Sequence, residues 1–248
     1  MRAQVHTHSF TIHTFEVDET WRAPVRVLCS LFQEAADEHA RILGVSQESF
    51  LSRGIAWALG ALSLRVTRRP KVRERITVAT WPCGVTRMYA LRHFRILDQQ
   101  GGELVRGSSG WLVLDLASRG LAAMPRELEA IEPPDEPVPL DDFPPKPPRL
   151  RQWDRELAVP VRREDLDPNQ HVNNARLLQW ALEAAPGEYA ALEPAEVDVL
   201  FRLECRHPDI VLSRCAAQES EQGQALVHSL VRQSDGKETT RARTVWRP

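Results

Sequence analysis

A proline-rich segment near the middle of the chain constrains the fold more than any other feature. Residues 132–150 read EPPDEPVPLDDFPPKPPRL, and each proline removes a backbone hydrogen-bond donor and fixes φ. Neither a helix nor a central strand can run through such a segment, which instead behaves as a semi-rigid extended spacer. We therefore predict an N-terminal domain over 1–131, a linker over 132–150 and a C-terminal domain over 151–248.

Composition limits the partners and the location of this chain. Of its 248 residues, 42% are hydrophobic, which is enough to fill the cores of two small domains. The formal net charge of -2 gives no general basic field for nucleic acid. No run approaches the ~20 apolar residues of a membrane span, and the first ten residues contain no apolar stretch of signal-peptide length. We expect a cytoplasmic protein with no nucleic-acid or membrane partner, and its four scattered cysteines are expected to be reduced.

Both predicted domains show the same order of elements, which is a strand, a helix and an antiparallel series of strands. Apolar residues recur with helical spacing over 25–44, and Gly44 stands where a helix would end. In the first domain we expect an opening strand around Phe10, Ile12 and Thr14, then strands at 56–66, 75–81, 89–97 and 111–115, with a bulge or bend at 107–110. In the second domain we expect an entry strand at 159–163, a helix at 174–185, strands at 197–205, 210–218, 225–233 and 239–246, and a hairpin turn at Asp235-Gly236. A helix followed by a long antiparallel sheet must bury its apolar stripe on that sheet, so the order predicts an α+β fold in two copies.

Two short motifs in the second domain carry the functional signal. The segment from Asp167 to Asn174, DPNQHVNN, resembles the DxNxHVNN signature of the plant-type acyl-acyl-carrier-protein (acyl-ACP) thioesterases. The segment FRLEC at 201–205 resembles the strand of that family that carries a glutamate followed by a cysteine. Weaker matches, FTIHTFEVD at 10–18 and QEAADEH at 33–39, extend the resemblance over nearly the full chain.

The resemblance implies a fold, an activity and a set of site residues. The family is built as a double hotdog, two tandem hotdog folds that each consist of a long helix wrapped by an antiparallel sheet. It hydrolyses fatty acyl-ACP to free fatty acid and holo-ACP, which ends chain elongation in fatty acid biosynthesis. By the resemblance, the catalytic residues are Asp167, Asn169, His171 and Glu204. The first domain lacks a second DxNxH motif, so one active site per chain is expected, with the acyl-chain pocket in that first domain.

The resemblance has departures that leave the acyl-chain preference open. Leu177 stands where the family has an aromatic residue, and Arg202-Leu203 replaces a more basic dipeptide. The sequence starts almost at the first strand, without the transit peptide of the plastid members, so we expect a bacterial relative.

The chemistry of these side chains agrees with thioester hydrolysis. His171 can exchange protons near neutral pH, and Asp167 or Glu204 can orient its imidazole. Asn173 or Asn174 can cap the following helix, whose first backbone N–H groups could polarise the thioester oxygen. An Asp-Pro-Asn turn before a capped helix is also common in structural loops, but the downstream glutamate favours a catalytic site.

Cys205 is a second candidate nucleophile, in a papain-like interpretation of Cys, His and Asn. We rank it below Glu204, because adjacent residues of a strand point to opposite faces and only one of the two can easily face His171. Such a cysteine is more often a small buried apolar residue, and that alternative is favoured here.

Three other functions remain open at this stage. The carrier could be coenzyme A, the domain could bind acyl groups without turnover, or the site could hydrate or dehydrate the acyl chain. A basic patch at the site would favour acyl carrier protein, which is acidic, and the candidate residues are Arg162, Arg163, Arg176 and Arg206. Sequence leaves the oligomeric state undecided, and a homodimer is one option.

Histidines near the N-terminus raise the question of a metal site. His6 and His8 share a strand face and His13 follows, but a structural zinc site needs about four ligands and no cysteine lies nearby. We therefore expect no metal and no cofactor.

Overall fold

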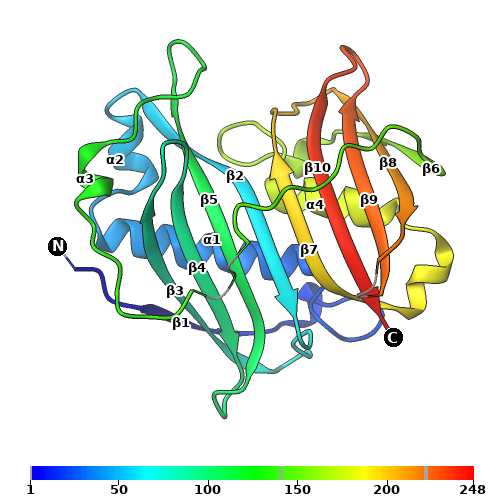
Figure 1. Ribbon diagram of the computed structural model, residues 1–248, viewed down its shortest axis with the longest axis horizontal. Helices are drawn as coiled ribbons and strands as arrows, with labels where there is room; N and C mark the ends of the chain where they lie inside the picture. The colour runs from blue at the N-terminus through cyan, green and yellow to red at the C-terminus, as the bar shows by residue number, and fades with distance from the viewer. Residues whose placement is uncertain (1, 139, 141, 221–222) are drawn as a thin grey trace. The chain divides into compact units, whose positions relative to one another are not determined.

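The computed structural model describes residues 2–138, 140, 142–220 and 223–248 (Figure 1). The chain forms two compact units, one of residues 1–62 and 66–144 and the other of residues 63–65 and 145–248. The division falls within the proline-rich segment, whose described residues form neither helix nor strand. Pro139 and Asp141 of that segment lie outside the described residues, and the predicted domain limits stay a prediction.

The first unit is an antiparallel sheet with one long helix against it. Its sheet has the strand order β1-β3-β4-β5-β2, and α1 packs against β1 and β3 (Figure 1). The elements are β1 (His6–Thr11), η1 (Thr14–Glu16), α1 (Val25–Ile42), α2 (Gln47–Leu51), β2 (Ile55–Val66), β3 (Arg75–Val85), β4 (Ala90–Leu97), β5 (Glu103–Asp115) and α3 (Arg126–Glu129). The opening strand is displaced from its prediction, because the chain turns at Thr14 into a 3₁₀ helix instead of continuing extended.

Helix α1 forms where the apolar spacing predicts it. Its buried stripe includes Leu28, Phe32 and Ala35, and the Phe32 ring stacks on Phe94 of β4 with 4.3 Å between centroids. The helix ends at Ile42, and Gly44 follows with a φ of 75°, a left-handed conformation that glycine adopts without steric cost. Burial of this stripe on the sheet stabilises the unit.

Residues 107–110 contain no bulge, and this part of the prediction is wrong. Strand β5 runs unbroken through them, and Gly107 and Gly110 pair directly with Phe94 and Leu91 of β4. A Cβ on Gly110 would lie 2.9 Å from the Tyr89 ring, so the glycine is needed for close packing of that ring and not for a bend.

The second unit repeats the arrangement with a shorter helix. Its sheet has the strand order β7-β10-β9-β8-β6, and α4 packs against β8 and β9. The elements are β6 (Arg155–Pro160), η2 (Arg163–Asp165), α4 (Asn174–Glu183), η3 (Gly187–Ala191), β7 (Glu193–Phe201), β8 (Ile210–Gln218), β9 (Gln224–Arg232) and β10 (Glu238–Arg247). Strand β6 begins four residues before the predicted entry strand, and β7 ends at Phe201, so Glu204 and Cys205 lie in the loop that follows.

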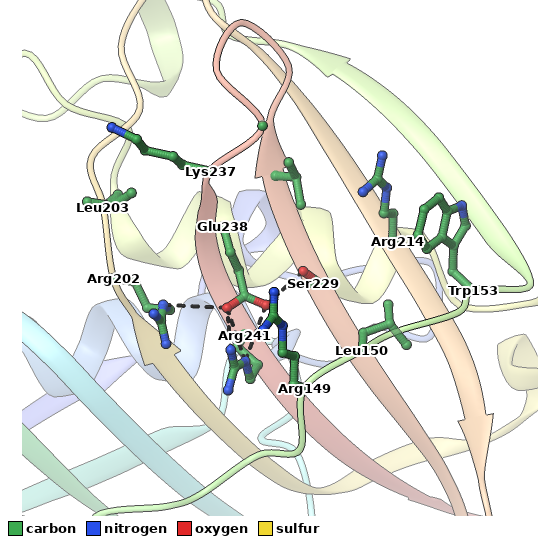
Figure 2. A pocket seen from close by; sticks show the side chains of 12 residues that line it. Arg149, Leu150, Trp153, Arg202, Leu203, Arg214, Ser229, Lys237, Glu238 and Arg241 are labelled. Atoms are coloured by element: carbon green, nitrogen blue, oxygen red, sulfur yellow. Dashed lines mark hydrogen bonds and ion pairs between the residues drawn. The ribbon is translucent and has the colours of Figure 1, made fainter.

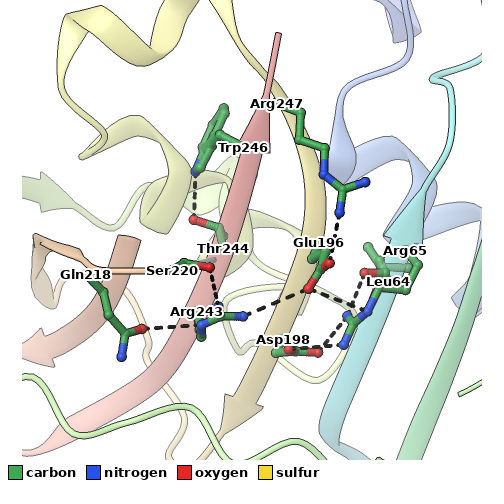
Figure 3. A network of polar contacts seen from close by, with 10 residues as sticks. All are labelled: Leu64, Arg65, Glu196, Asp198, Gln218, Ser220, Arg243, Thr244, Trp246 and Arg247. Carbon is green, nitrogen blue, oxygen red and sulfur yellow. Dashed lines mark hydrogen bonds and ion pairs between the residues drawn. The ribbon is translucent and has the colours of Figure 1, made fainter. Parts of the chain in front are cut away.

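Two carboxylates on β7 are held by arginines, as Figure 3 shows. Arg65 contacts Asp198 with 2.9 Å between Nη1 and Oδ1, and its Nε lies 3.8 Å from Glu196. Arg243 and Arg247 also contact Glu196, at 3.9 and 3.3 Å. Both acidic side chains are mostly buried, and a carboxylate in that position is tolerated only with cationic partners.

No helix among the described residues is long and apolar enough to cross a membrane.

Candidate active site

The loop before α4 folds around the side chain of Asp167. Its Oδ1 accepts hydrogen bonds from the backbone N–H groups of Asn169 at 2.8 Å and His171 at 3.2 Å. Gln170 has a φ of 62°, and its N–H donates to the Asp167 carbonyl, which closes the turn. Asp167 therefore shapes the loop backbone that presents the imidazole, and in this geometry its contacts are with that backbone.

The paired asparagines have different positions at the start of α4. Asn173 is the N-cap residue, and its side-chain oxygen accepts the N–H of Ala175 at 2.8 Å. Its carbonyl also accepts the N–H of Arg176 at 2.9 Å, whereas Asn174 is the first helical residue. Two N–H groups of the first turn are thus already hydrogen-bonded to Asn173. Fewer N–H groups at this helix tip are left to donate to a thioester oxygen.

The loop after β7 is tied to the first loop through its backbone. The N–H of Val172 donates to the carbonyl of Cys205 at 2.9 Å, and both side chains belong to one core cluster with Leu177 and Trp180. Arg232 adds a second anchor, because its Nη1 donates to the carbonyl of Glu204 at 2.9 Å. These contacts bring together two segments that lie more than 30 residues apart in the chain.

His171 and Glu204 meet at the surface end of this junction. The imidazole Nε2 lies 2.9 Å from Glu204 Oε2, and the two side chains are 25% and 43% exposed. Both are thus within reach of water and of a bound substrate. A carboxylate within hydrogen-bond distance of an imidazole can hold its tautomer and balance a positive charge on the ring.

Arg206 contacts both members of this pair. Its Nη2 lies 2.5 Å from His171 Nε2 and 2.9 Å from Glu204 Oε2. Since a guanidinium only donates, Nε2 must be unprotonated to accept from Arg206, but must carry a proton to donate to Glu204. The two contacts of Nε2 therefore correspond to alternative protonation states of one ring nitrogen.

Cys205 faces the core and not the site. Its side chain is fully buried, and burial raises the pKa of the thiol to about 11. A neutral buried thiol is a poor nucleophile. The opposite exposure of Glu204 and Cys205 agrees with the expected alternation, although β7 has already ended.

Asn169 and the arginines predicted as a basic patch are the remaining candidates from the sequence. Asn169 is exposed beside the turn. Of the four arginines proposed as a basic patch, Arg162 pairs with Glu164 and Arg176 lies 3.7 Å from Asp165. Arg206 was predicted as one of the cations of a patch at the site, and the structure places it in direct contact with His171 and Glu204. Arg206 follows Glu204 by two residues, so in an extended segment both side chains lie on the same side. This spacing was the signal that could have placed Arg206 at the site.

A cationic pocket of about 500 Å³ lies in the same unit (Figure 2). Its lining includes Arg202 and Leu203, which directly precede Glu204, but neither His171 nor Glu204 itself. Figure 2 shows Glu238 at its centre, with Arg241 at 2.6 Å and Arg202 at 3.4 Å. This acidic group neutralises part of the positive charge of the pocket.

Comparison with known proteins agrees with this architecture. The family model described as the acyl-ACP thioesterase N-terminal domain matches residues 3–131, and the acyl-ACP thioesterase C-terminal domain matches residues 150–248. A chloroplastic palmitoyl-acyl carrier protein thioesterase of Cuphea hookeriana is 31% identical over 98% of this chain. The chain spans 62% of the length of that relative.

Two solved structures share the fold over almost their whole length. The 12:0-ACP thioesterase of Umbellularia californica is 24% identical, covers 98% of this chain and 97% of its own, and has a TM-score of 0.86. An acyl-ACP thioesterase of Bacteroides thetaiotaomicron is 22% identical, covers 98% of each chain and has a TM-score of 0.85. The predicted α+β double-hotdog fold is confirmed. With family models matching both halves, the chain belongs to the acyl-ACP thioesterase family.

Proposed function

We propose that this chain hydrolyses fatty acyl-ACP to free fatty acid and holo-ACP, and thereby ends chain elongation. Family membership supports the reaction class. The observation that carries the proposal is the 2.9 Å contact between His171 Nε2 and Glu204 Oε2 at an exposed loop junction. An imidazole and a carboxylate in contact supply the proton acceptor and donor that thioester hydrolysis needs.

In the proposed reaction, a water oxygen attacks the thioester carbonyl carbon while His171 or Glu204 accepts the proton of that water. The carbonyl becomes an oxyanion, and donors near the tip of α4 and the Arg206 guanidinium are available to stabilise it. The oxyanion then collapses, the C–S bond breaks, and the leaving thiolate takes the proton back from the group that accepted it, either the imidazolium of His171 or the carboxyl of Glu204. Asn169 is proposed to hold the water or the substrate, and Asp167 to hold the loop.

Glu204 could instead attack the carbonyl directly and form an acyl-enzyme. The two routes can differ in whether the oxygen atom of water enters the fatty acid or the Glu204 carboxylate. If hydrolysis proceeds over many turnovers in H₂¹⁸O, water attack leaves the Glu204 carboxylate unlabelled, whereas an anhydride that water opens on the protein side places ¹⁸O in Glu204. Mass spectrometry of the peptide that contains Glu204 reads the label, and Glu238 serves as the unlabelled control.

The carrier is the next question, because coenzyme A presents the same thioester. The acidic surface of an acyl carrier protein needs cationic partners, and Arg206 and Arg202 flank Glu204. Arg202 is already paired with Glu238, so the charge available at the site mouth is modest. We expect a higher kcat/KM on acyl-ACP than on acyl-CoA of the same chain length, with a rate on ACP that falls as salt is added.

The deciding experiment measures free fatty acid and free thiol released by the purified chain from acyl-ACP and acyl-CoA series. Release of both products in equal amounts supports the proposal. Tight acyl-thioester binding without any release would indicate a non-catalytic acyl-binding module. Formation of an enoyl product from a 3-hydroxyacyl thioester, without thiol release, would indicate a dehydratase.

Two further expectations stay proposals. A cytoplasmic location and a homodimer can be tested by cell fractionation and by light scattering of the purified chain.

A further inference from the structure

A second imidazole–carboxylate cluster lies in the first unit, outside the site described above. His6 Nε2 lies 2.9 Å from Glu38 Oε2, and His8 Nδ1 lies 2.5 Å from the same oxygen. The two histidines are separated by one residue on β1 and so project from the same face of the strand, and Glu38 comes from α1. Sequence analysis placed the two histidines together, but the structure adds the carboxylate.

The elements and neighbouring rings that carry these side chains hold them in place. His6 and His8 belong to a strand whose backbone pairs with Thr80 and Val78 of β3. The His8 ring stacks on Phe10 with 4.1 Å between centroids, and the His6 ring stacks on His39 at 5.3 Å. Ligands carried by regular elements and oriented by packing need little reorganisation to bind an ion.

His39 supports the cluster without joining it. Its Nδ1 lies 3.0 Å from Arg92 Nη1, and since arginine only donates, this nitrogen is the acceptor. The ring that stacks on His6 is therefore held by Arg92 from the other element packed against it, and its Nδ1 carries no proton in this contact.

The three ligand atoms lie close to the spacing that a metal ion requires. They all lie within 4.8 Å of one another. Ligands at about 2.0–2.1 Å from a tetrahedral zinc ion are about 3.3 Å apart, so the ion needs only a small outward movement of the Glu38 carboxylate. Glu38 is 39% exposed, which allows that movement and leaves room for water as a further ligand.

We propose that His6, His8 and Glu38 form a binding site for one divalent transition-metal ion of the zinc type, with water completing the coordination. Two imidazoles and one carboxylate suit zinc and its neighbours better than calcium or magnesium, which prefer sites made of oxygen. The ion links the edge strand β1 to α1. It stabilises the first unit because only the folded chain brings the three ligands together.

Zinc binding to the full chain tests the proposal. After treatment with EDTA and its removal, the protein is titrated with ZnCl₂ by calorimetry, and with CoCl₂ by visible absorption. We expect one equivalent to bind, and binding at least tenfold weaker in His8→Ala and in Glu38→Gln. His13→Ala is the matched control, because His13 is an exposed neighbouring histidine that stacks on Phe15 outside the cluster.

A second control removes the other imidazole–carboxylate pair. His171→Ala should bind zinc like the unmodified chain, and a loss of the binding equivalent in that variant would assign the ion to the other site and overturn the proposal. Absence of saturable binding to the unmodified chain, or unchanged affinity in both cluster variants, would also overturn it. Should His8→Ala fold poorly, X-ray absorption of the unmodified cobalt complex decides, since two imidazole ligands are expected and fewer would contradict the site. None of these measurements depends on hydrolytic activity.

Discussion

Among the described residues, an imidazole–carboxylate contact of 2.9 Å occurs in each unit, and the two clusters differ in the third group. In the second unit the third group is Arg206, which contacts the imidazole nitrogen that also faces Glu204. In the first unit it is a second imidazole, His8, which contacts the same carboxylate as His6. A guanidinium beside the pair opposes a metal ion and leaves the imidazole to exchange protons, whereas a second imidazole adds a metal ligand. The same pair of groups is therefore suited to acid–base chemistry in one unit and to cation binding in the other.

The surroundings strengthen this difference. His171 and Glu204 lie in two loops joined by a backbone hydrogen bond, with both side chains open to substrate. His6 and His8 lie on a strand, oriented by stacked rings. Loops that meet over a buried core can admit a substrate, while a strand and a helix hold a fixed set of ligands.

The largest expected effect is at the hydrolytic pair. His171→Ala and Glu204→Gln should each lower kcat by roughly 10²–10⁴-fold, because each removes a group that transfers or balances a proton in the transition state. Free thiol release from acyl-ACP measures the rate, and circular dichroism checks the fold. Cys205→Ala is the comparison variant and should retain substantial activity, since its thiol is buried and neutral. Equal, near-total loss in all three variants would return Cys205 to the role of nucleophile.

Buried histidines should make the stability of the chain sensitive to acid. Burial lowers the pKa of His228 to about 4, and its Nε2 lies 2.8 Å from the Thr244 hydroxyl. The folded chain therefore binds fewer protons here than the unfolded chain between pH 6.5 and 4, so stability is full above about pH 6.5 and falls as the pH drops to 4. This histidine accounts for a loss on the order of 3 kcal/mol between pH 7 and pH 4.

Urea unfolding at pH 7 and pH 4.5 measures this loss. His228→Leu should be less stable than the unmodified chain at pH 7, because it removes the buried hydrogen bond between the imidazole and the Thr244 hydroxyl, but should lose less stability on acidification. Part of the acid sensitivity should persist, since burial also lowers the pKa of His93 to about 4. An identical pH dependence in both proteins would contradict the assignment of a neutral buried His228.

Removal of the guanidinium sharpens the comparison between the clusters. Arg206→Ala should lower kcat about tenfold, because Glu204 loses a charge-assisted partner that holds it at 2.9 Å. Since Nε2 of His171 then loses its contact with Arg206 but keeps the one with Glu204, the pH dependence of kcat/KM should also change, which simple loss of packing would not produce. Arg206→Lys should recover part of the rate by keeping the charge. A change in KM alone, with the pH profile unaltered, would make Arg206 a substrate contact only.

The sequence predicts local structure at these sites better than it predicts their partners. Helix α1, Gly44 after its end and the hairpin at Gly236 follow from spacing and from conformational preference. The end of β7 could not be predicted in this way, because it depends on a distant part of the chain. The N–H groups of Arg202 and Leu203 donate hydrogen bonds to the carbonyl of Thr239.

The same limit applies to the functional groups. Family resemblance paired His171 with Glu204, but the contact of Arg206 with the imidazole depends on how the loop turns after Cys205. The carboxylate beside His6 and His8 comes from a helix 30 residues away, and nothing in the local pattern of either segment indicates the other. A local sequence pattern cannot predict which side chain another element will bring into contact when the elements pack together.

The smallest predicted effect concerns the helix that supports the hydrolytic site. Helix α4 is capped by Asn173, whose side chain accepts the N–H of Ala175, whereas α1 begins after Pro24 without a side-chain cap. Asn173→Ala should therefore lower the free energy of unfolding by about 1 kcal/mol, and Asn174→Ala, one position into the helix, by much less. Urea unfolding of both variants measures the difference. Activity of the two variants adds a second test, because a larger loss of kcat in Asn174→Ala than in Asn173→Ala would mean that Asn174 contacts the substrate and that the role of the paired asparagines is not capping alone.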